Sequence, residues 1–449
     1  MLDYFSKHIG RYLKYMLLAY ALVSITYTTA RFYNITGSPH ARTRRSVIEP
    51  LPPQEKETFF VAPLDQTSIE KDEQQELETI IYYDQLQSSQ RDFGVNRGPK
   101  IDMNFDPVFQ SKAFSGAMGP SNIQPYYYKA SDTTEGEDIS ISTIVTSDRF
   151  PVLSRLASRY QGPISAAIHI NDDEQKESIL AKLQQTYHEN PDMKRHVDVH
   201  LIIDKFDRQF NMWRNTAKLY ARTDYIMMLD IDFYLCTDFR KDILKNTAIM
   251  NKLRQGDTAL VIPAFEYIAQ SDGFTYEDFP QTKDDLLMEV FEEEKLDMFH
   301  RSWEKGHSAT NYFKWYTATE PYLVEDYNFS YEPYVIFKRQ GSPWCDERFI
   351  GYGANKAACL YEIYISGIDY YVLPNDFIIH QSHDYPEATR KRERLFNRKV
   401  YANFREELCL RYSRQFVANN QWETSVADNL RNECRKIRGF TDVIKHIDQ

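Results

Sequence analysis

A regular alternation of apolar strands and helical segments, beginning at residue 139, constrains the fold of this chain more than any other feature. Apolar segments of strand length occupy residues 139–147, 163–171, 197–204 and 225–229. The segments between them have helical periodicity and occupy residues 149–161, 173–190 and 210–224. Strands that alternate with helices predict an α/β fold with a mostly parallel central sheet and flanking helices.

The fourth strand ends in two aspartates, Asp230 and Asp232, within the segment DYIMMLDIDFYL. Residues i and i+2 of a strand point to the same face, and two like charges there are costly unless a cation compensates them. Ligands of open α/β sheets bind at the carboxyl ends of strands, and carboxylate oxygens suit Mg²⁺ or Mn²⁺. The pair therefore indicates either a cation site that can bridge the diphosphate of a nucleotide sugar, or two solvated aspartates that begin a loop.

A second candidate ligand follows an apolar run in FIIHQSH, where His380 ends an expected strand within residues 370–385. An imidazole that joins two carboxylates would favour Mn²⁺ over Mg²⁺. A single histidine at such a place is also commonly structural. His383 is the weaker candidate, expected beside the site or at the surface.

An apolar run at 258–267 predicts a further strand, and the charged segment after residue 386 predicts an outer helix.

Two further segments carry polar residues of interest. FNMWRNTAK places Arg214 and Asn215 in the helix before the Asp-x-Asp strand, where arginine can neutralise phosphate and asparagine can bind a base or sugar. The alternative is a salt bridge on the helix surface. CDERFIGYG places Asp346 and Glu347 before two glycines, where a carboxylate can deprotonate an acceptor hydroxyl. The alternative is a turn with surface acids.

Composition limits the classes of protein. The chain has 449 residues, of which 42% are hydrophobic, enough for a sizeable core. Its net charge of −11 argues against a nucleic-acid binder, which would show a basic surface. The five cysteines form no CxxC pair, so zinc modules are not indicated, while one or two disulfides fit an oxidising compartment.

The N-terminal segment suggests a membrane anchor. Residues 15–30 carry no charge and follow Lys7, Arg11 and Lys14. With a small extension the segment reaches spanning length, so residues 12–30 are expected to form an uncleaved signal anchor behind a cytoplasmic tail of residues 1–11. A cleaved signal peptide is the alternative.

Residues 31–137 are expected to form a partly disordered stem, and residues 138–449 a catalytic domain with a helical C-terminal tail. Asn34 and Asn328 lie in N-x-S/T sequons, which matter only on the luminal side of a membrane.

Taken together, these segments resemble glycosyltransferase family 49, which contains the glucuronyltransferases that build the matriglycan chain on dystroglycan. The resemblance covers roughly residues 139–412 and rests on GPISAAIHIND, RNTAKLYARTDYIMMLDIDF, ALVIPAFE, KGHSATNYFKWYTATEPY, EPYVIFKR, DERFIGYGANK and VLPNDFIIHQSH. It implies a GT-A fold, a single-pass type II protein of the Golgi membrane with a luminal catalytic domain, a UDP-sugar donor, a glycan or glycoprotein acceptor, Mn²⁺ and inversion at the anomeric carbon. Glucuronate is the expected sugar.

The resemblance also implies roles for individual residues. Asp230, Asp232 and His380 resemble the metal set, and Arg214 and Asn215, with Asp230, resemble donor-site residues. Asp346 resembles the catalytic base, with Glu347 turned to solvent or to a neighbouring cation. A glucuronate carboxylate would need a cationic partner, and the candidates are Lys314, Arg348 and Lys356.

Two other classes of function remain open from the sequence. A metal-dependent hydrolase of phosphate or sugar esters could also use two aspartates and a histidine, and it would release product without an acceptor. A non-catalytic glycan-binding membrane protein would bind glycan and tolerate the loss of Asp232.

Overall fold

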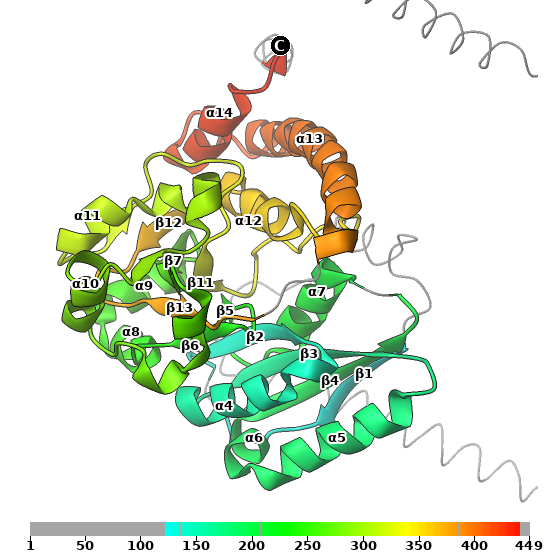
Figure 1. Cartoon of the computed structure of the whole chain (residues 1–449). Helices are drawn as coiled ribbons and strands as arrows, with labels where there is room; N and C mark the ends of the chain where they lie inside the picture. The colour runs from blue at the N-terminus through cyan, green and yellow to red at the C-terminus, as the bar shows by residue number, and fades with distance from the viewer. Residues whose placement is uncertain (1–121, 135, 207, 384–386, 441–449) are drawn as a thin grey trace, which may run out of the picture. The chain divides into compact units, whose positions relative to one another are not determined.

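The computed structural model describes residues 122–134, 136–206, 208–383 and 387–440, and these contain a nine-stranded sheet and a four-stranded sheet (Figure 1). The strand order in the larger sheet is β1-β4-β3-β2-β5-β11-β7-β12-β10, and in the smaller sheet β6-β13-β8-β9. The strands are β1 (Asn122–Tyr128), β2 (Ile139–Val145), β3 (Ile164–Asn171), β4 (Val197–Asp204), β5 (Tyr225–Met228), β6 (Phe233–Leu235), β7 (Thr258–Ile262), β8 (Ala264–Tyr267), β9 (Leu296–Met298), β10 (Tyr322–Leu323), β11 (Tyr334–Lys338), β12 (Asp369–Val372) and β13 (Ile378–His380).

Helices lie on both sides of the larger sheet. The α-helices are α4 (Phe150–Tyr160), α5 (Lys176–Glu189), α6 (Pro191–His196), α7 (Phe210–Tyr220), α8 (Phe239–Lys245), α9 (Thr247–Gln255), α10 (Lys283–Phe291), α11 (Tyr312–Thr317), α12 (Asn355–Ile365), α13 (Glu387–Ala418) and α14 (Asp428–Cys434). The short 3₁₀ helices are η2 (Ser147–Arg149), η3 (Gln270–Phe274), η4 (Tyr276–Asp278), η5 (Arg301–Gly306), η6 (Ser308–Thr310) and η7 (Ser425–Ala427).

The first part of the fold agrees with the predicted alternation of strands and helices. Strands β4, β3, β2 and β5 run parallel. Successive residues of β3 serve opposite faces, since Ala166 and Ile168 pack in one core cluster, with residues of α4 and α5, whereas Ala167 packs in another against Trp213 of α7. The parallel block is therefore covered by helices on both faces, and most residues of its strands are buried.

The prediction of a mostly parallel sheet holds only in part, because antiparallel strands enter the rest of the larger sheet, where β7 and β12 still pair parallel. Strand β11 lies between β5 and β7 and runs antiparallel to both, and the edge strands β1 and β10 are also antiparallel to their neighbours. The sheet is therefore mixed. The sequence did not predict β11 because this strand lies in the aromatic-rich segment 311–339, which has no clear alternating pattern.

Two apolar runs that the sequence presented as single strands are each divided between the two sheets. The run at 258–267 is interrupted at Pro263, so that β7 joins the larger sheet and β8 the smaller. A proline has no N–H to donate to a ladder, although the Pro263 carbonyl still accepts from the Ile378 amide at 3.0 Å. The run at 370–385 divides in the same way into β12 and β13.

The folded domain begins earlier than the predicted boundary at residue 138. Strand β1 pairs with β4, and just beyond it the Ala130 amide donates to the buried carboxylate of Asp198 at 2.9 Å. Residues 122–128 are therefore part of the sheet rather than of a stem. The tyrosine-rich sequence of β1 gives no clear alternation, which is why the strand was missed.

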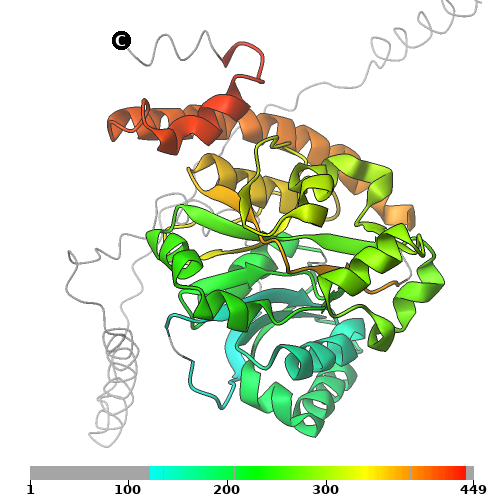
Figure 2. The same ribbon diagram turned by 90° about the vertical axis from the view of Figure 1, so that its left-hand side faces the viewer.

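The predicted C-terminal helix is confirmed. Figure 2 shows α13 and α14, in orange and red, on one side of the molecule over α12. The disulfide Cys409–Cys434 joins α13 to α14, and the disulfide Cys345–Cys359 joins the loop before α12 to that helix. Cys236 is a buried free thiol.

Within the residues that the structure describes, no helix combines the length and the apolar character needed to cross a membrane. The expected anchor at residues 12–30, the sequon at Asn34 and most of the expected stem lie outside the described residues.

Candidate functional site

The Asp-x-Asp segment meets the histidine segment through the smaller sheet. Strand β6 begins directly after Asp232 and pairs antiparallel with β13, which places His380 opposite Phe233. The Gln381 amide also donates to the Asp232 carbonyl at 2.8 Å. Residues almost 150 positions apart in the sequence are therefore fixed side by side by ladder hydrogen bonds.

Asp232, His380 and His383 form the candidate metal centre. One ligand atom from each lies within 4.8 Å of the others. The His383 Nε2 atom is 3.3 Å from Asp232 Oδ2. His383 therefore belongs to the cluster, contrary to the lesser position expected from the sequence. Its spacing of three residues from His380 in a segment that leaves a strand was the signal that could have identified it.

The surroundings of His380 keep its ring neutral. Burial lowers the pKa of His380 to about 3, although the Asp232 carboxylate opposes this shift. The rings of Phe299 and Phe233 pack on the imidazole at centroid distances of 4.9 and 5.2 Å. A neutral imidazole is the form that coordinates a metal ion, so the apolar packing keeps His380 in the form that a cation site would require.

Asp230 lies in a different environment from Asp232. Lys356 Nζ is 3.0 Å from Asp230 Oδ2, Arg214 donates to Oδ1 at 3.3 Å, and the Tyr334 hydroxyl donates to Oδ2 at 3.2 Å. Burial alone would raise the pKa of Asp230, but Lys356 and Arg214 outweigh it and hold the pKa far below its usual range. The two aspartates thus have separate partners. The expected metal set was Asp230, Asp232 and His380, but the observed cluster contains His383 in place of Asp230.

Helix α7 supplies both predicted donor-site residues, in unequal positions. Arg214 reaches Asp230 with one nitrogen and donates to Asn355 Oδ1 at 2.7 Å with another. Asn215 instead exchanges hydrogen bonds with the Cys345 backbone, both at 2.9 Å, and donates to Glu347 Oε1 at 2.6 Å. Arg214 therefore belongs to the site, whereas the Asn215 amide anchors the Cys345 loop to α7.

The loop after Cys345 holds its two acidic residues differently from the sequence expectation. Asp346 is buried, and both of its carboxylate oxygens accept from Arg348, at 2.8 to 3.1 Å. Glu347 is also buried, against Asn215, rather than turned to solvent. The geometry thus places the expected base in an ion pair with Arg348, whose side chain is half-exposed.

A further acid, Glu332, was not identified from the sequence. It lies two residues before Tyr334, and positions i and i+2 of an extended segment share a face. Burial, followed by the nearby Asp230 carboxylate, raises the pKa of Glu332, while Lys356 and Arg214 oppose the shift. The spacing between Glu332 and Tyr334 could have indicated it only once Tyr334 was known to face Asp230.

Of the three cations considered for a uronate carboxylate, only Lys356 faces the Asp230 group. Its Nζ atom lies over the Tyr334 ring at 3.3 Å from the centroid. Lys314 pairs with Glu325 at 3.6 Å on the surface, and Arg348 pairs with Asp346. Lys356 stands in the first turn of α12, just after the glycine loop, and so depends on the conformation of that loop.

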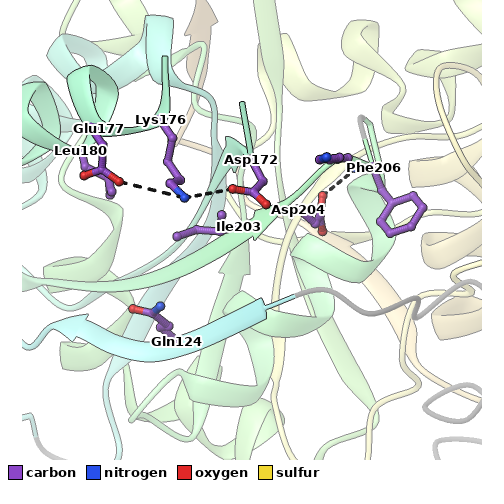
Figure 3. A pocket seen from close by; sticks show the side chains of 9 residues that line it. Gln124, Asp172, Lys176, Glu177, Leu180, Ile203, Asp204 and Phe206 are labelled. Atoms are coloured by element: carbon purple, nitrogen blue, oxygen red, sulfur yellow. Dashed lines mark hydrogen bonds and ion pairs between the residues drawn. The ribbon is translucent and has the colours of Figure 1, made fainter. Parts of the chain in front are cut away.

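A cavity lies elsewhere in the described domain. It has a volume of about 570 Å³ and opens between β1, β4 and α5. Figure 3 shows Lys176 paired with Asp172 at its rim and Phe206 at one end. None of the candidate metal or donor residues is among the nine that line it. The chemistry of the residues, rather than this cavity, therefore locates the candidate site.

Comparison with known proteins identifies the family. A family model described as a glycosyl-transferase for dystroglycan matches residues 138–209 and 203–413, which is more than half of the chain. The chain belongs to this family. The match includes both aspartates of the Asp-x-Asp segment, His380 and His383, so the cluster lies within the part of the chain that defines the family.

Several known proteins are similar to the chain. Xylosyl- and glucuronyltransferase LARGE2s of Danio rerio is 32% identical over 259 residues, which cover 57% of this chain and 33% of that protein. Xylosyl- and glucuronyltransferase LARGE1 of Homo sapiens is 29% identical over 295 residues, covering 64% and 37%. Glycosyltransferase-like protein gnt14 of Dictyostelium discoideum is 30% identical over 249 residues, covering 55% and 37%. The matched part of the chain spans about a third of the length of these relatives.

Among solved structures, GalNAc-T7 with UDP, GalNAc and Mn²⁺ aligns over 69% of this chain and 57% of its own, at 13% identity and a TM-score of 0.37. This likeness is too distant to bear on the site.

Proposed function

We propose that the chain is a glycosyltransferase that moves a sugar, expected to be glucuronate, from a UDP-sugar to a hydroxyl of a glycan or glycoprotein acceptor, with inversion. The observation that carries the proposal is the cluster of Asp232, His380 and His383 at the end of the Asp-x-Asp strand in a chain of this family. A GT-A type arrangement is consistent with four parallel strands that lead to the Asp-x-Asp segment.

The residues of the cluster fit a divalent cation. One carboxylate and two imidazoles form a mixed oxygen and nitrogen donor set, which suits Mn²⁺ better than Mg²⁺. We propose that Asp232, His380 and His383 hold Mn²⁺. Asp230 is proposed to act at the donor instead, through its contacts with Arg214 and Lys356. A bound ion at this place would stabilise the charge of the departing diphosphate.

The donor is proposed to lie between the cluster and α7. Arg214 and Lys356 meet at Asp230, so this edge of the site presents two cationic side chains to an anionic donor. Their charge can hold the diphosphate and stabilise it as it leaves. Lys356 is the proposed partner of a uronate carboxylate among the three cations considered.

Asp346 is the proposed base, as the resemblance implies. It would accept the proton of the acceptor hydroxyl as that oxygen attacks the anomeric carbon from the face opposite the diphosphate. The contact with Arg348 has to open first, because a carboxylate held by a guanidinium is a weaker base. Arg348 is half-exposed and also contacts Glu407 at 2.9 Å, so it has an alternative partner when it leaves Asp346.

The decisive test is a donor screen with the purified full-length protein. Transfer from UDP-glucuronate to a glycan acceptor is expected with Mn²⁺, and its loss is expected with excess chelator. Release of free sugar in water at the same rate with and without acceptor would favour the hydrolase reading instead. Binding of glycan without turnover of any UDP-sugar would favour the non-catalytic reading.

The disulfide Cys345–Cys359 supports a prediction about the donor site. It closes the loop that carries Asp346 and the start of α12, and so it fixes Lys356. Replacing both cysteines with alanine should lower the free energy of unfolding by about 3 kcal/mol, the value for a loop of about 15 residues, and should weaken UDP binding. Chemical denaturation and nucleotide titration measure the two effects.

The matched control is the pair Cys409 and Cys434, which joins α13 to α14 away from the site. Its double alanine variant should lose stability without losing nucleotide affinity. Equal losses of affinity in both double variants would mean that the first disulfide acts through general stability alone.

We further propose a Golgi location with the described domain in the lumen and a single N-terminal anchor. The two disulfides support an oxidising compartment. Asn328 is half-buried in a tight turn in which its side chain accepts from the Ser330 amide at 2.8 Å, within the loop between β10 and β11.

Glycosylation tests this topology. Endoglycosidase treatment of the full-length protein from a eukaryotic secretory host should increase its electrophoretic mobility, and Asn34→Gln and Asn328→Gln should each remove one step of the shift. A luminal domain would be contradicted by a full-length protein that carries no glycan at either sequon and is cleaved by protease added on the cytosolic side.

A further inference from the structure

Arg149 lies at the candidate metal centre, although the sequence pattern assigns it no role. It ends η2, which begins two residues after the last residue of strand β2, and it immediately precedes α4. Its Nε atom is 3.1 Å from Asp232 Oδ1, and its side chain keeps 22% of its surface exposed. Arg149 therefore occupies one oxygen of the carboxylate that the cation needs.

The Asp232 carboxylate has both oxygens engaged in the structure. Arg149 contacts Oδ1 and His383 contacts Oδ2. A divalent cation that binds Asp232 would lie beside the Arg149 guanidinium, and like charges a few ångströms apart repel. Cation binding at Asp232 and the present position of Arg149 are therefore in competition.

Arg149 differs from the other two cations of the site in what holds it. Arg214 and Lys356 both pair with Asp230 and are more deeply buried, with 10% and 5% of their side chains exposed. Apart from Asp232, Arg149 contacts only the neighbouring Asp148 among the ion pairs of the described residues, at 3.4 Å, and the Asp148 side chain is 67% exposed. An exposed carboxylate of this kind holds a guanidinium weakly.

We propose that Arg149 is a positioning residue that shields Asp232 before the cation binds and then turns to an anionic group of the donor. This rests on the proposed function. The group is either the diphosphate or the uronate carboxylate, since a guanidinium forms paired hydrogen bonds with both. The exchange couples the two ligands, because the cation releases the arginine that then helps to hold the donor.

The proposal predicts effects of opposite sign on the two ligands. Arg149→Gln keeps most of the side-chain stem and removes the charge. In the absence of nucleotide it should bind Mn²⁺ about two- to fivefold more tightly than the wild type, the size expected for one partly exposed ion pair. With saturating Mn²⁺ it should bind the donor roughly tenfold or more weakly, because a charged hydrogen bond is lost.

The experiment uses full-length protein, with Mn²⁺ binding followed by electron paramagnetic resonance and nucleotide binding by calorimetry. UDP, UDP-glucose and UDP-glucuronate are compared. A loss shared by all three assigns the diphosphate, and a loss confined to UDP-glucuronate assigns the carboxylate. Arg195→Ala, which breaks an exposed ion pair with Asp132, is the control and should change neither affinity.

Unchanged affinities in Arg149→Gln, or a loss of both together, would overturn the proposal and leave Arg149 a structural residue. Arg149→Lys keeps the charge and is used if the glutamine variant does not fold. With saturating Mn²⁺, the lysine variant should lose less donor affinity than the roughly tenfold expected for Arg149→Gln. A wild-type protein that binds neither Mn²⁺ nor any UDP-sugar would instead refute the proposed function itself.

Discussion

The Asp232→Asn variant should lose sugar transfer by at least roughly a thousandfold while remaining folded. A metal ion supplies several kcal/mol of charge stabilisation in the transition state, and each 1.4 kcal/mol is about a factor of ten in rate. Asp232 is the only carboxylate in the three-residue cluster, so the asparagine removes the one anionic ligand there. Its partners Arg149 and His383 contact it at a partly exposed position, so its loss should cost little stability.

The matched control for this variant is Asp148→Asn. Asp148 also contacts Arg149, but it lies outside the cluster and its side chain is largely exposed. Transfer rates, thermal melting and Mn²⁺ titration should be compared for both proteins. Full activity of Asp232→Asn, or activity of the wild type that survives exhaustive chelation, would reject the metal role of the cluster.

The Asp346→Asn variant should lower kcat by roughly a hundredfold or more, since general base catalysis contributes about 10²–10⁴ in rate. Asparagine keeps the size of the side chain and a hydrogen-bond acceptor for Arg348, but it cannot take up the proton. The affinity for UDP should change little, because the diphosphate is proposed to lie at Arg214 and Lys356. Steady-state kinetics and nucleotide titration separate the two quantities.

Two other acids serve as comparisons for Asp346. Glu347→Gln removes the charge of the neighbouring residue, which is held against Asn215, and should cost much less activity. Glu332→Gln removes the charge of the acid beside Lys356 and Asp230. If Glu332→Gln is inactive and Asp346→Asn is active, the base is Glu332, and the ion pair between Asp346 and Arg348 has only a structural role.

The sequence predicted the parts of the fold that depend on local pattern. Strand β4 agrees with its expected bounds, and α7 begins at the expected Phe210 because an apolar stripe marks it. The pattern could not show that Pro263 sends one apolar run into two sheets, nor that β11 would enter the larger sheet between β5 and β7. Those features depend on pairings between distant segments, which periodicity does not record.

The candidate site divides in the same way. Asp230 and Asp232 were predictable from their position at a strand end, and His380 from its own strand end. Their partners were not, because Arg149 and Lys356 approach from other segments of the chain. The spacing of two residues suggested that Asp230 and Asp232 act together, whereas the structure gives each aspartate a separate set of partners.

The position of β11 has a consequence for how the protein is made. Within the part of the chain that the structure describes, β11 alone joins β5 to β7 in the sheet, although it is synthesised after both. During translation the β5 edge has no partner on that side, and an open apolar edge strand is a template for pairing with other chains. The two halves of the sheet join only once residue 338 has been synthesised, so a ribosome-bound chain that ends before β11 should depend on chaperones to protect that edge.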